Sequence, residues 1–232
     1  MKISALIPSA GLGLRMGGDT RKQYLHISEK PIAVHTLLRF QSLAEIGQII
    51  LIVPKDDIPF CERDIVSRFQ LHKVKKIIAG GKERQDSVYN GLKALDGDED
   101  IVIVHDGVRP FATASMIRES IRVASASGAA IVAIPVKDTL KSVSKEGRIE
   151  RTVDRNGLWQ AQTPQTFQRE LLHRAYDKAM MENFYGTDDA SLVERLGETV
   201  CVVRGSEFNI KITTPRDLVL AEGILRHPEI DQ

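Results

Sequence analysis

The amino-acid sequence predicts a protein of the α/β class, built on a doubly wound, mostly parallel β-sheet. Two patterns predict it: short apolar runs rich in Ile and Val recur along the chain, and segments with apolar residues at three- and four-residue spacing separate them. Continuous apolar runs indicate strands buried on both faces, and strands that alternate with helices pair in parallel beneath those helices. The predicted strands span residues 3–7, 49–53, 74–78, 101–104 and 131–136.

The predicted helices lie between these strands and over most of the chain after them. The first begins at Pro31, because proline suits a first helical position, where the N–H needs no partner. Ligands bind beyond the carboxyl ends of parallel strands, so the loops after the first, third and fourth strands are expected to line one crevice. The remaining elements are helices at 83–95, 115–126, 168–181 and 189–196, a strand at 199–203 and a last helix from Pro215.

Residues 137–158 are expected to form a protruding β-arm on a chain that is otherwise one domain, 1–232. The segments 139–144 and 149–153 alternate in polarity, and Lys145-Glu146-Gly147-Arg148 can turn between them. A hairpin outside the α/β core needs a surface to pack on. Because homodimers are the commonest oligomers, we expect that surface to be a second copy of the chain.

Composition narrows the classes of partner and compartment. The 232 residues carry 32 Lys and Arg against 31 Asp and Glu, a formal charge of +1, so no global basic field holds nucleic acid or an anionic membrane. Cys61 and Cys201 lie too far apart for a disulfide framework or zinc site, which favours a reducing compartment, the cytoplasm or a plastid stroma after removal of a transit peptide. The apolar runs are too short for a signal-peptide core or a membrane span.

A glycine-rich turn, Pro8-Ser9-Ala10-Gly11-Leu12-Gly13-Leu14-Arg15-Met16-Gly17-Gly18, follows the first strand, with Lys22 shortly after it. Glycine lets backbone N–H groups approach an anion closely, and Arg15 and Lys22 add charge, so we call 8–18 with Lys22 the phosphate loop. It does not fit a Walker A motif, and three residues rather than two separate Gly13 from Gly17, unlike the dinucleotide fingerprint. The alternative is a tight turn with two solvated cations.

Asp106 follows a predicted buried strand, so its carboxylate is expected at the rim of the crevice. A single carboxylate suits Mg²⁺, which keeps most of its waters and takes its other ligands from substrate phosphates. The alternative is that Asp106 caps a loop or pairs with Arg109. Its neighbour His105 is interpreted as a packed or hydrogen-bonded histidine rather than a base.

Three further segments carry candidate binding groups. Gly80-Gly81 runs into a helix, with Ser87 placed to hydrogen-bond a nucleobase; the alternative is an ordinary helix N-terminus with Glu83 favourable to its dipole. Arg155 and Lys211 could bind a phosphorylated substrate, the arginine through two parallel N–H groups and the lysine through its single ammonium charge. The alternative is that both form surface salt bridges. Segments 163–165 and 187–191 are interpreted as polar turns, the second also as a helix cap.

These motifs, in this order and over essentially the whole length, resemble the 2-C-methyl-D-erythritol 4-phosphate cytidylyltransferase family of the non-mevalonate isoprenoid pathway. The resemblance implies a Rossmann-like nucleotidyltransferase sheet and a homodimer with exchanged arms that complete each other's active sites. The matching motifs are Pro8 to Met16, Lys22-Gln23-Tyr24, Gly80 to Val88, His105 to Pro110, Asp154 to Trp159, Thr163-Pro164-Gln165 and Asn209 to Thr213.

The resemblance also implies a reaction and a set of roles. In this family a phosphate oxygen of methylerythritol phosphate attacks the α-phosphorus of CTP in line, which gives 4-diphosphocytidyl-2-C-methyl-D-erythritol and pyrophosphate, with Mg²⁺ or another divalent cation as cofactor. Arg15 and Lys22 match the catalytic residues. The nucleotide-binding positions are Pro8, Ser9, Ala10, Gly11, Gly13, Gly81 and Ser87. The positions that hold the acceptor are Asp106, Arg109, Thr139, Arg155, Thr187 and Lys211, with Asp106 also the metal ligand.

Two positions differ from the family pattern, and two alternative functions remain. Arg21 stands where many relatives have proline, and Lys82 occupies a place that can be acidic. A ribitol 5-phosphate cytidylyltransferase shares the phosphate loop, His-Asp and Asn-Ile-Lys elements, although the segment 155–159 favours the methylerythritol enzyme. A non-catalytic nucleotide-binding module is the other rival, and Arg15, Lys22 and Asp106 argue against it.

Overall fold

A seven-stranded sheet forms the centre of the computed structural model, which describes residues 1–11 and 21–227. The strand order is β11-β7-β10-β6-β1-β4-β5. Every neighbouring pair is parallel except the two pairs that β10 makes with β6 and β7. The strands are β1 (Ile3–Pro8), β4 (Gln48–Val53), β5 (Val74–Ala79), β6 (Ile101–Val104), β7 (Ala129–Pro135), β10 (Trp159–Gln168) and β11 (Cys201–Arg204).

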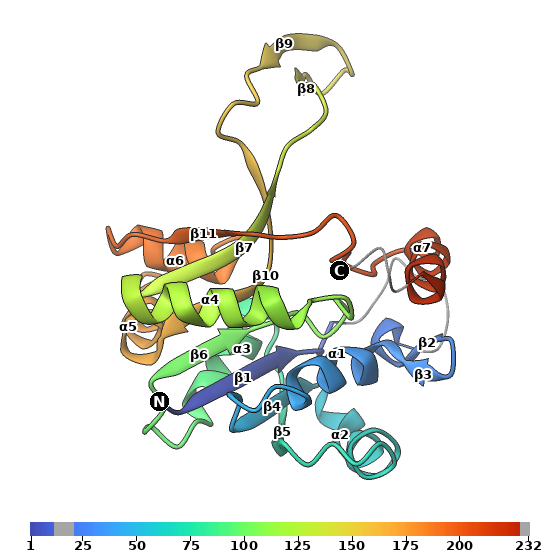
Figure 1. Cartoon of the computed structure of the whole chain (residues 1–232). Coiled ribbons are helices and arrows are strands. Elements are labelled where there is room, and N and C mark those ends of the chain that lie inside the picture. The colour runs from blue at the N-terminus through green and yellow to red at the C-terminus, as the bar shows by residue number, and fades with distance from the viewer. Residues whose placement is uncertain (12–20, 228–232) are drawn as a thin grey trace.

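Helices cover both faces of this sheet, so the doubly wound prediction is confirmed (Figure 1). Along β1, Ala5 and Ile7 face one apolar cluster and Leu6 faces the other, as period-2 alternation in a strand requires. The first cluster includes side chains of α1 (Ile32–Gln41) and α4 (Ala114–Ser127). The second includes side chains of α3 (Arg84–Lys93), α5 (Arg169–Met181) and α6 (Asp189–Arg195).

The prediction of a polar turn at 163–165 is wrong, because these residues lie inside β10, a strand that sequence reasoning missed. The strand reads WQAQTPQTFQ, and the polar side chains of its middle, residues 162–166, are nevertheless buried: Gln165 is 1% exposed and Thr166 is fully buried. Partners inside the protein make this possible. Gln165 donates to Asp188 at 2.7 Å, and the hydroxyl of Thr166 lies 2.8 Å from that of Ser120. A buried strand with satisfied polar groups lacks the apolar signal that marks the others.

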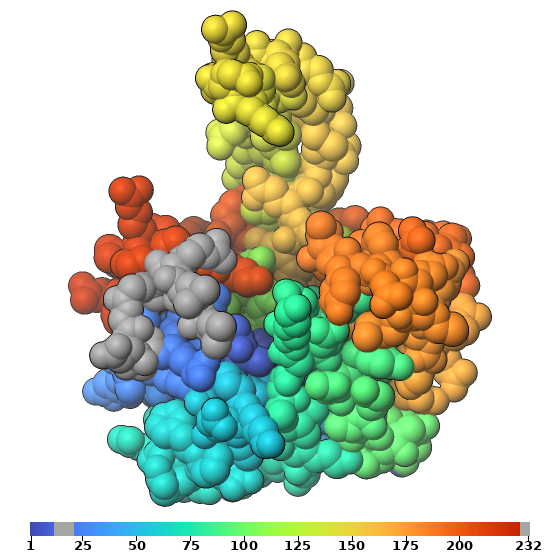
Figure 2. All heavy atoms as spheres, turned by 180° about the vertical axis from the view of Figure 1, so that it is seen from behind, coloured from blue at the N-terminus to red at the C-terminus, as the bar shows by residue number. Residues whose placement is uncertain are grey.

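The arm is a separate two-stranded sheet of β8 (Leu140–Val143) and β9 (Ile149–Val153), so the predicted hairpin is confirmed. It rises from the end of β7 and returns into β10 (Figure 1), and the view from behind in Figure 2 shows it standing clear of the body. Val143 and Ile149 are 50% and 65% exposed. The arm therefore presents apolar side chains that the rest of this chain does not cover.

Smaller elements complete the described chain. The 3-10 turn η2 (Lys22–Tyr24) leads into a two-stranded ribbon of β2 (His26–Ile27) and β3 (Lys30–Pro31). The short helices η3 (Lys55–Asp57), α2 (Ile58–Phe60) and the π-helical η4 (Cys61–Ser67) connect β4 to β5, and α7 (Pro215–Arg226) ends the described part. Within residues 1–11 and 21–227, every helix is too short or too polar to span a bilayer.

Candidate active site

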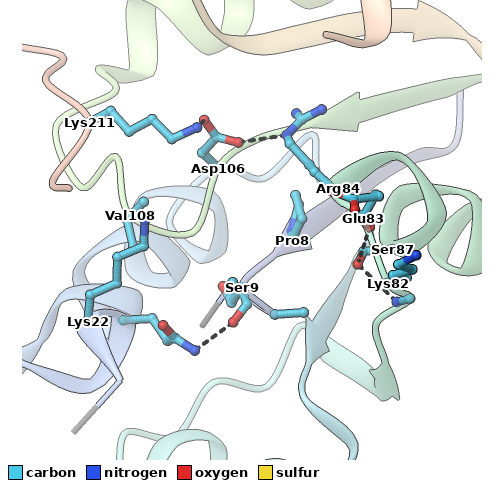
Figure 3. A pocket seen from close by; sticks show the side chains of 14 residues that line it. Pro8, Ser9, Lys22, Lys82, Glu83, Arg84, Ser87, Asp106, Val108 and Lys211 are labelled. Carbon is cyan, nitrogen blue, oxygen red and sulfur yellow. Dashed lines mark hydrogen bonds and ion pairs between the residues drawn. The ribbon is translucent and has the colours of Figure 1, made fainter. Parts of the chain in front are cut away.

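A pocket of about 200 Å³ lies at the carboxyl ends of β1, β5 and β6 (Figure 3). The strand order changes direction at β1, which has β4 on one side and β6 on the other, and such switch points are where open α/β sheets bind ligands. The pocket joins the three loops that the sequence placed in one crevice. Its described lining residues are Pro8, Ser9, Ala10, Gly11, Lys22, Gln23, Gly81, Lys82, Glu83, Arg84, Ser87, Asp106, Val108 and Lys211.

The phosphate loop enters this pocket through its two described ends, residues 8–11 and Lys22. The buried side chain of Gln23 donates to the carbonyl of Ser9 at 2.8 Å, which holds η2 and its Lys22 against the end of β1. The predicted residues Gly13 and Arg15 lie outside the described residues. Lys22 therefore is the catalytic candidate that the structure places in the pocket.

The second glycine turn borders the same pocket and is closed by its own hydrogen bonds. The N–H of Gly81 donates to the hydroxyl of Ser87 at 3.0 Å, and that hydroxyl donates to the carbonyl of Glu83 at 3.0 Å. Glu83 is also the N-cap of α3 in a capping box with Asp86, so the helix N-terminus interpretation holds as well. A Cβ on Gly81 would lie 2.3 Å from the Cβ of Asp86, so only glycine fits there without a shift.

Asp106 lies at the centre of a cluster of cationic side chains. Its carboxylate oxygens are 2.8 Å from Lys211 Nζ, 3.1 Å from Arg84 Nε and 3.6 Å from Arg109 Nε. Figure 3 shows Lys211 and Arg84 reaching it from opposite sides. Burial alone would raise the pKa of Asp106, but Arg84, Lys211 and Arg109 outweigh it and hold that pKa well below its usual range. Asp106 is therefore an ionised carboxylate, and its predicted pairing with Arg109 is accompanied by two closer ion pairs.

A second pocket adjoins the first on the far side of Asp106. Arg84, Asp106 and Lys211 line both pockets, and Arg109 and Thr187 line the second. The structure thus brings four of the six predicted acceptor-binding residues, Asp106, Arg109, Thr187 and Lys211, into the lining of one pocket.

Asn209 fixes the segment that carries Lys211. Its buried side-chain amide donates to the carbonyl of Thr163 at 2.9 Å, and its own carbonyl accepts from Arg109 Nη1 at 2.7 Å. Sequence reasoning placed Asn209 in a matching motif without a role. The hydrogen bonds show that it joins the loop before α7 to β10, and so sets where Lys211 lies.

Arg155 and Thr139, the other two predicted acceptor-binding residues, lie on the arm. Both are exposed, and neither is among the described residues that line the two pockets. The guanidinium of Arg155 donates to the carbonyl of Lys137, within the arm itself. Within one chain, therefore, the structure does not bring these two residues to the site.

His105 is a packed histidine, as predicted. The ring is fully buried, with Nε2 2.9 Å from the carbonyl oxygen of Arg109 and Nδ1 3.1 Å from the hydroxyl of Thr163. Burial lowers its pKa to about 4, so the ring is neutral at neutral pH. It supports the loop that carries Asp106 and borders neither pocket among the residues described.

This buried ring predicts a loss of stability in mild acid. The ring binds a proton below about pH 6.5 in the unfolded chain but only near pH 4 in the folded one. The stability that depends on the neutral ring is complete above pH 6.5 and falls as the pH drops towards 4. His105→Gln should therefore remove about 2 kcal/mol of the difference between the unfolding free energies at pH 7 and pH 5, measured with urea.

A matched variant at the exposed His72, His72→Gln, is the control for the loss of a histidine at the surface. An unchanged dependence in His105→Gln would contradict the assignment of a buried, neutral ring.

Arg21 and Lys82, the two departures from the family pattern, differ in their surroundings. Arg21 Nε lies 2.9 Å from Asp57 Oδ2, the same oxygen that accepts from the hydroxyl of Tyr24 at 2.9 Å. This links the end of the phosphate loop to η3. Lys82 is exposed and lines the first pocket.

The doubly wound sheet has a glycine-containing turn at its switch point and an ionised carboxylate among cations between two pockets, which fits the nucleotidyltransferase class that the sequence motifs indicate. The comparisons with known proteins agree: the sequence model of the 2-C-methyl-D-erythritol 4-phosphate cytidylyltransferase family matches residues 3–227. The chain belongs to this family.

Relatives and solved structures of the same description are similar over nearly the full length. The cytidylyltransferase of Syntrophus aciditrophicus is 51% identical over 98% of this chain and 97% of its own, and that of Geotalea uraniireducens is 49% identical over 97% of each. The crystal structure of 4-diphosphocytidyl-2C-methyl-D-erythritol synthase from Anaerococcus prevotii has a TM-score of 0.85 at 35% identity, and covers 97% of this chain and 96% of its own. The Thermus thermophilus cytidylyltransferase has a TM-score of 0.80 at 33% identity, and covers 97% and 100%.

Proposed function

We propose that this chain transfers a cytidylyl group from CTP to 2-C-methyl-D-erythritol 4-phosphate and releases pyrophosphate. The observation that carries the proposal is the place of Asp106, between a pocket bordered by the phosphate loop and a pocket bordered by Arg109, Thr187 and Lys211. The first pocket suits the nucleotide and the second the acceptor phosphate. Family membership supplies the identity of both substrates.

The chemistry needs positioning and charge stabilisation rather than a covalent intermediate. An acceptor phosphate oxygen attacks the α-phosphorus of CTP in line, and negative charge grows on the departing pyrophosphate. Lys22 lines the first pocket beside the loop that follows β1, and its ammonium group stabilises the negative charge on the pyrophosphate. Lys211 and Arg109 line the second pocket, where their charges would hold the acceptor phosphate beside the nucleotide pocket.

We propose that Mg²⁺ binds together with the triphosphate, with Asp106 as its protein carboxylate. The donor chemistry fits, because Asp106 is ionised and borders both pockets. Both of its oxygens already contact cations, and among the described residues no three His, Cys, Asp or Glu side chains gather into a metal site. Bound there, Mg²⁺ would neutralise phosphoryl charge that repels the acceptor. Mg²⁺ alone is therefore expected not to bind this protein.

We also propose that two chains exchange arms and that the protein works in the cytoplasm. The exposed Val143 and Ile149 on the arm favour the first proposal, as does the distance of Arg155 and Thr139 from the pockets of their own chain. The two free thiols, Cys61 and Cys201, suit a reducing compartment.

The function is tested by pyrophosphate release from purified protein with CTP, Mg²⁺ and methylerythritol phosphate. Turnover should require all three components and stop when EDTA removes the metal. A parallel assay with ribitol 5-phosphate distinguishes the proposed activity from that of a ribitol 5-phosphate cytidylyltransferase. CTP binding without turnover of either polyol phosphate would indicate a non-catalytic module. Absence of pyrophosphate release with methylerythritol phosphate would overturn the proposal.

Arg155→Ala should raise the KM for methylerythritol phosphate at least about tenfold, the loss of one charged hydrogen bond, and leave the affinity for CTP unchanged. The expected reason is that the partner's arm brings this guanidinium to the acceptor phosphate. Steady-state kinetics and calorimetry with CTP measure the two effects. Arg151→Ala, an exposed arginine on β9, serves as the control. An unchanged KM in Arg155→Ala would refute the role given to Arg155.

A further inference from the structure

Arg84 has no assigned role, yet it is the side chain that joins Asp106 to the interior of the protein. It lies at the first position of α3 and lines both pockets. Its Nε lies 3.1 Å from Asp106 Oδ1, while Nη1 and Nη2 donate to the two carboxylate oxygens of Asp189 at 3.1 and 2.8 Å. One planar guanidinium thus bridges two carboxylates in a fixed direction.

Asp189 lies behind the two pockets and is held by hydrogen bonds from β10 and α5. It is fully buried, and it is not among the described residues that line either pocket. The hydroxyl of the fully buried Tyr176, on α5, donates to Asp189 Oδ1 at 2.5 Å. The buried amide oxygen of Gln165, on β10, accepts from the backbone N–H of Asp189 at 3.1 Å. The hydroxyl of Tyr176 therefore holds the carboxylate of Asp189, and Gln165, which itself lines the second pocket, holds its backbone.

A purely structural ion pair would not need the third contact. If Asp189 only needed a cation, the doubly hydrogen-bonded guanidinium would satisfy it, because two parallel N–H···O bonds form the strongest such geometry. Arg84 uses its remaining Nε–H on Asp106, a second ionised carboxylate on a different loop. The direction of Asp106 is thereby tied to the positions of α5 and α6.

We propose that Tyr176 and Asp189 are positioning residues for the transfer reaction, which act by holding Arg84 so that its Nε fixes the carboxylate of Asp106. This inference rests on the proposed function. Residues that contact a ligand-binding side chain, but not the ligand, set the orientation of that side chain. Removing their hydrogen bonds therefore lowers turnover. Tyr176, Asp189 and Arg84 should therefore behave as one unit.

The chain offers a matched pair of variants for the test. The ring of Tyr89 stacks on that of Tyr176, with centroids 5.8 Å apart, but its hydroxyl donates at 2.8 Å to Asp177 rather than to Asp189. Tyr176→Phe and Tyr89→Phe therefore remove the same atom from neighbouring rings. Asp189→Asn and Asp177→Asn form a second matched pair.

The expected result is that Tyr176→Phe lowers kcat/KM for methylerythritol phosphate roughly tenfold, the loss of one hydrogen bond to a charged acceptor, and Asp189→Asn about 10- to 100-fold. Tyr89→Phe and Asp177→Asn should match the wild type. In Arg84→Ala, the further change Asp189→Asn should alter kcat/KM by less than about threefold, since residues that act through one partner are not additive. Additive losses, or wild-type kinetics in a folded Tyr176→Phe, would overturn the proposal.

A second readout does not depend on turnover. In ¹⁵N spectra of the intact protein, the Arg84 Nε–H resonance should shift in Tyr176→Phe and Asp189→Asn and stay in place in Tyr89→Phe. An unshifted resonance in all three would overturn the positioning role even if the wild type proved inactive with methylerythritol phosphate. Wild-type inactivity combined with the expected shifts would instead count against the proposed function alone.

Discussion

Lys22→Ala should lower kcat by at least about a hundredfold, roughly the loss of one preorganised donor at a developing charge. Lys22 lies in η2, which Gln23 ties to the carbonyl of Ser9, so its backbone is held at the edge of the pocket that its side chain lines. Such a cation stabilises the charge on the departing pyrophosphate more than it stabilises bound CTP. The expected fall is therefore in kcat, measured by pyrophosphate release at saturating substrates.

Lys82→Ala is the matched control, because Lys82 lines the same pocket but is exposed. It should change kcat by less than about threefold, as removal of a solvated surface charge usually does. A loss in Lys22→Ala that is confined to KM would contradict the role in the transition state.

Asp106→Asn should reduce both stability and turnover. The substitution keeps the shape of the side chain but removes the charge that neutralises Arg84, Lys211 and Arg109. Removal of one partner from a buried ion pair costs about 3–5 kcal/mol. We expect about 3 kcal/mol, since Arg84 and Lys211 are 31% and 37% exposed and water relieves part of the strain.

The expected loss of kcat in Asp106→Asn is at least about a hundredfold, because Lys211 loses its anchor and the proposed metal loses its carboxylate. Urea unfolding and pyrophosphate release measure the two effects on the same sample. Asp56→Asn, at an exposed position in η3, should change neither. Wild-type stability in Asp106→Asn would show that the three cations do not need this charge.

The sequence identified most of the sheet because five of its strands are continuous apolar runs, and the helices between them have apolar residues at three- and four-residue spacing. β6 is the clearest case, since all four of its residues are buried and apolar. β10 could not be found in this way. Its buried Gln165 and Thr166 are satisfied by partners on α4 and at the start of α6, and nothing in the local sequence records those partners.

The residues of the candidate site also fall into two groups, those that the local sequence could place and those that it could not. Residues that follow a predicted strand directly, such as Ser9, Gly81 and Asp106, could be placed at the pocket from topology alone. Arg84 could not be given a role, because a charged residue at the start of a helix is ordinarily a solvated one. The partner that gives it a role, Asp189, is 105 residues away in the chain.

The arm and the site share a strand. Beyond the body, β7 and β10 continue as paired strands, with Trp159 opposite Pro135, before they separate into the arm. Further along β10, the hydroxyl of Thr163 accepts from the backbone N–H of Asp106 at 3.1 Å. β10 therefore connects the base of the arm to the loop that carries Asp106. In the proposed exchanged pair, the partner that holds the arm would therefore be connected through β10 to the site of the chain whose arm it holds.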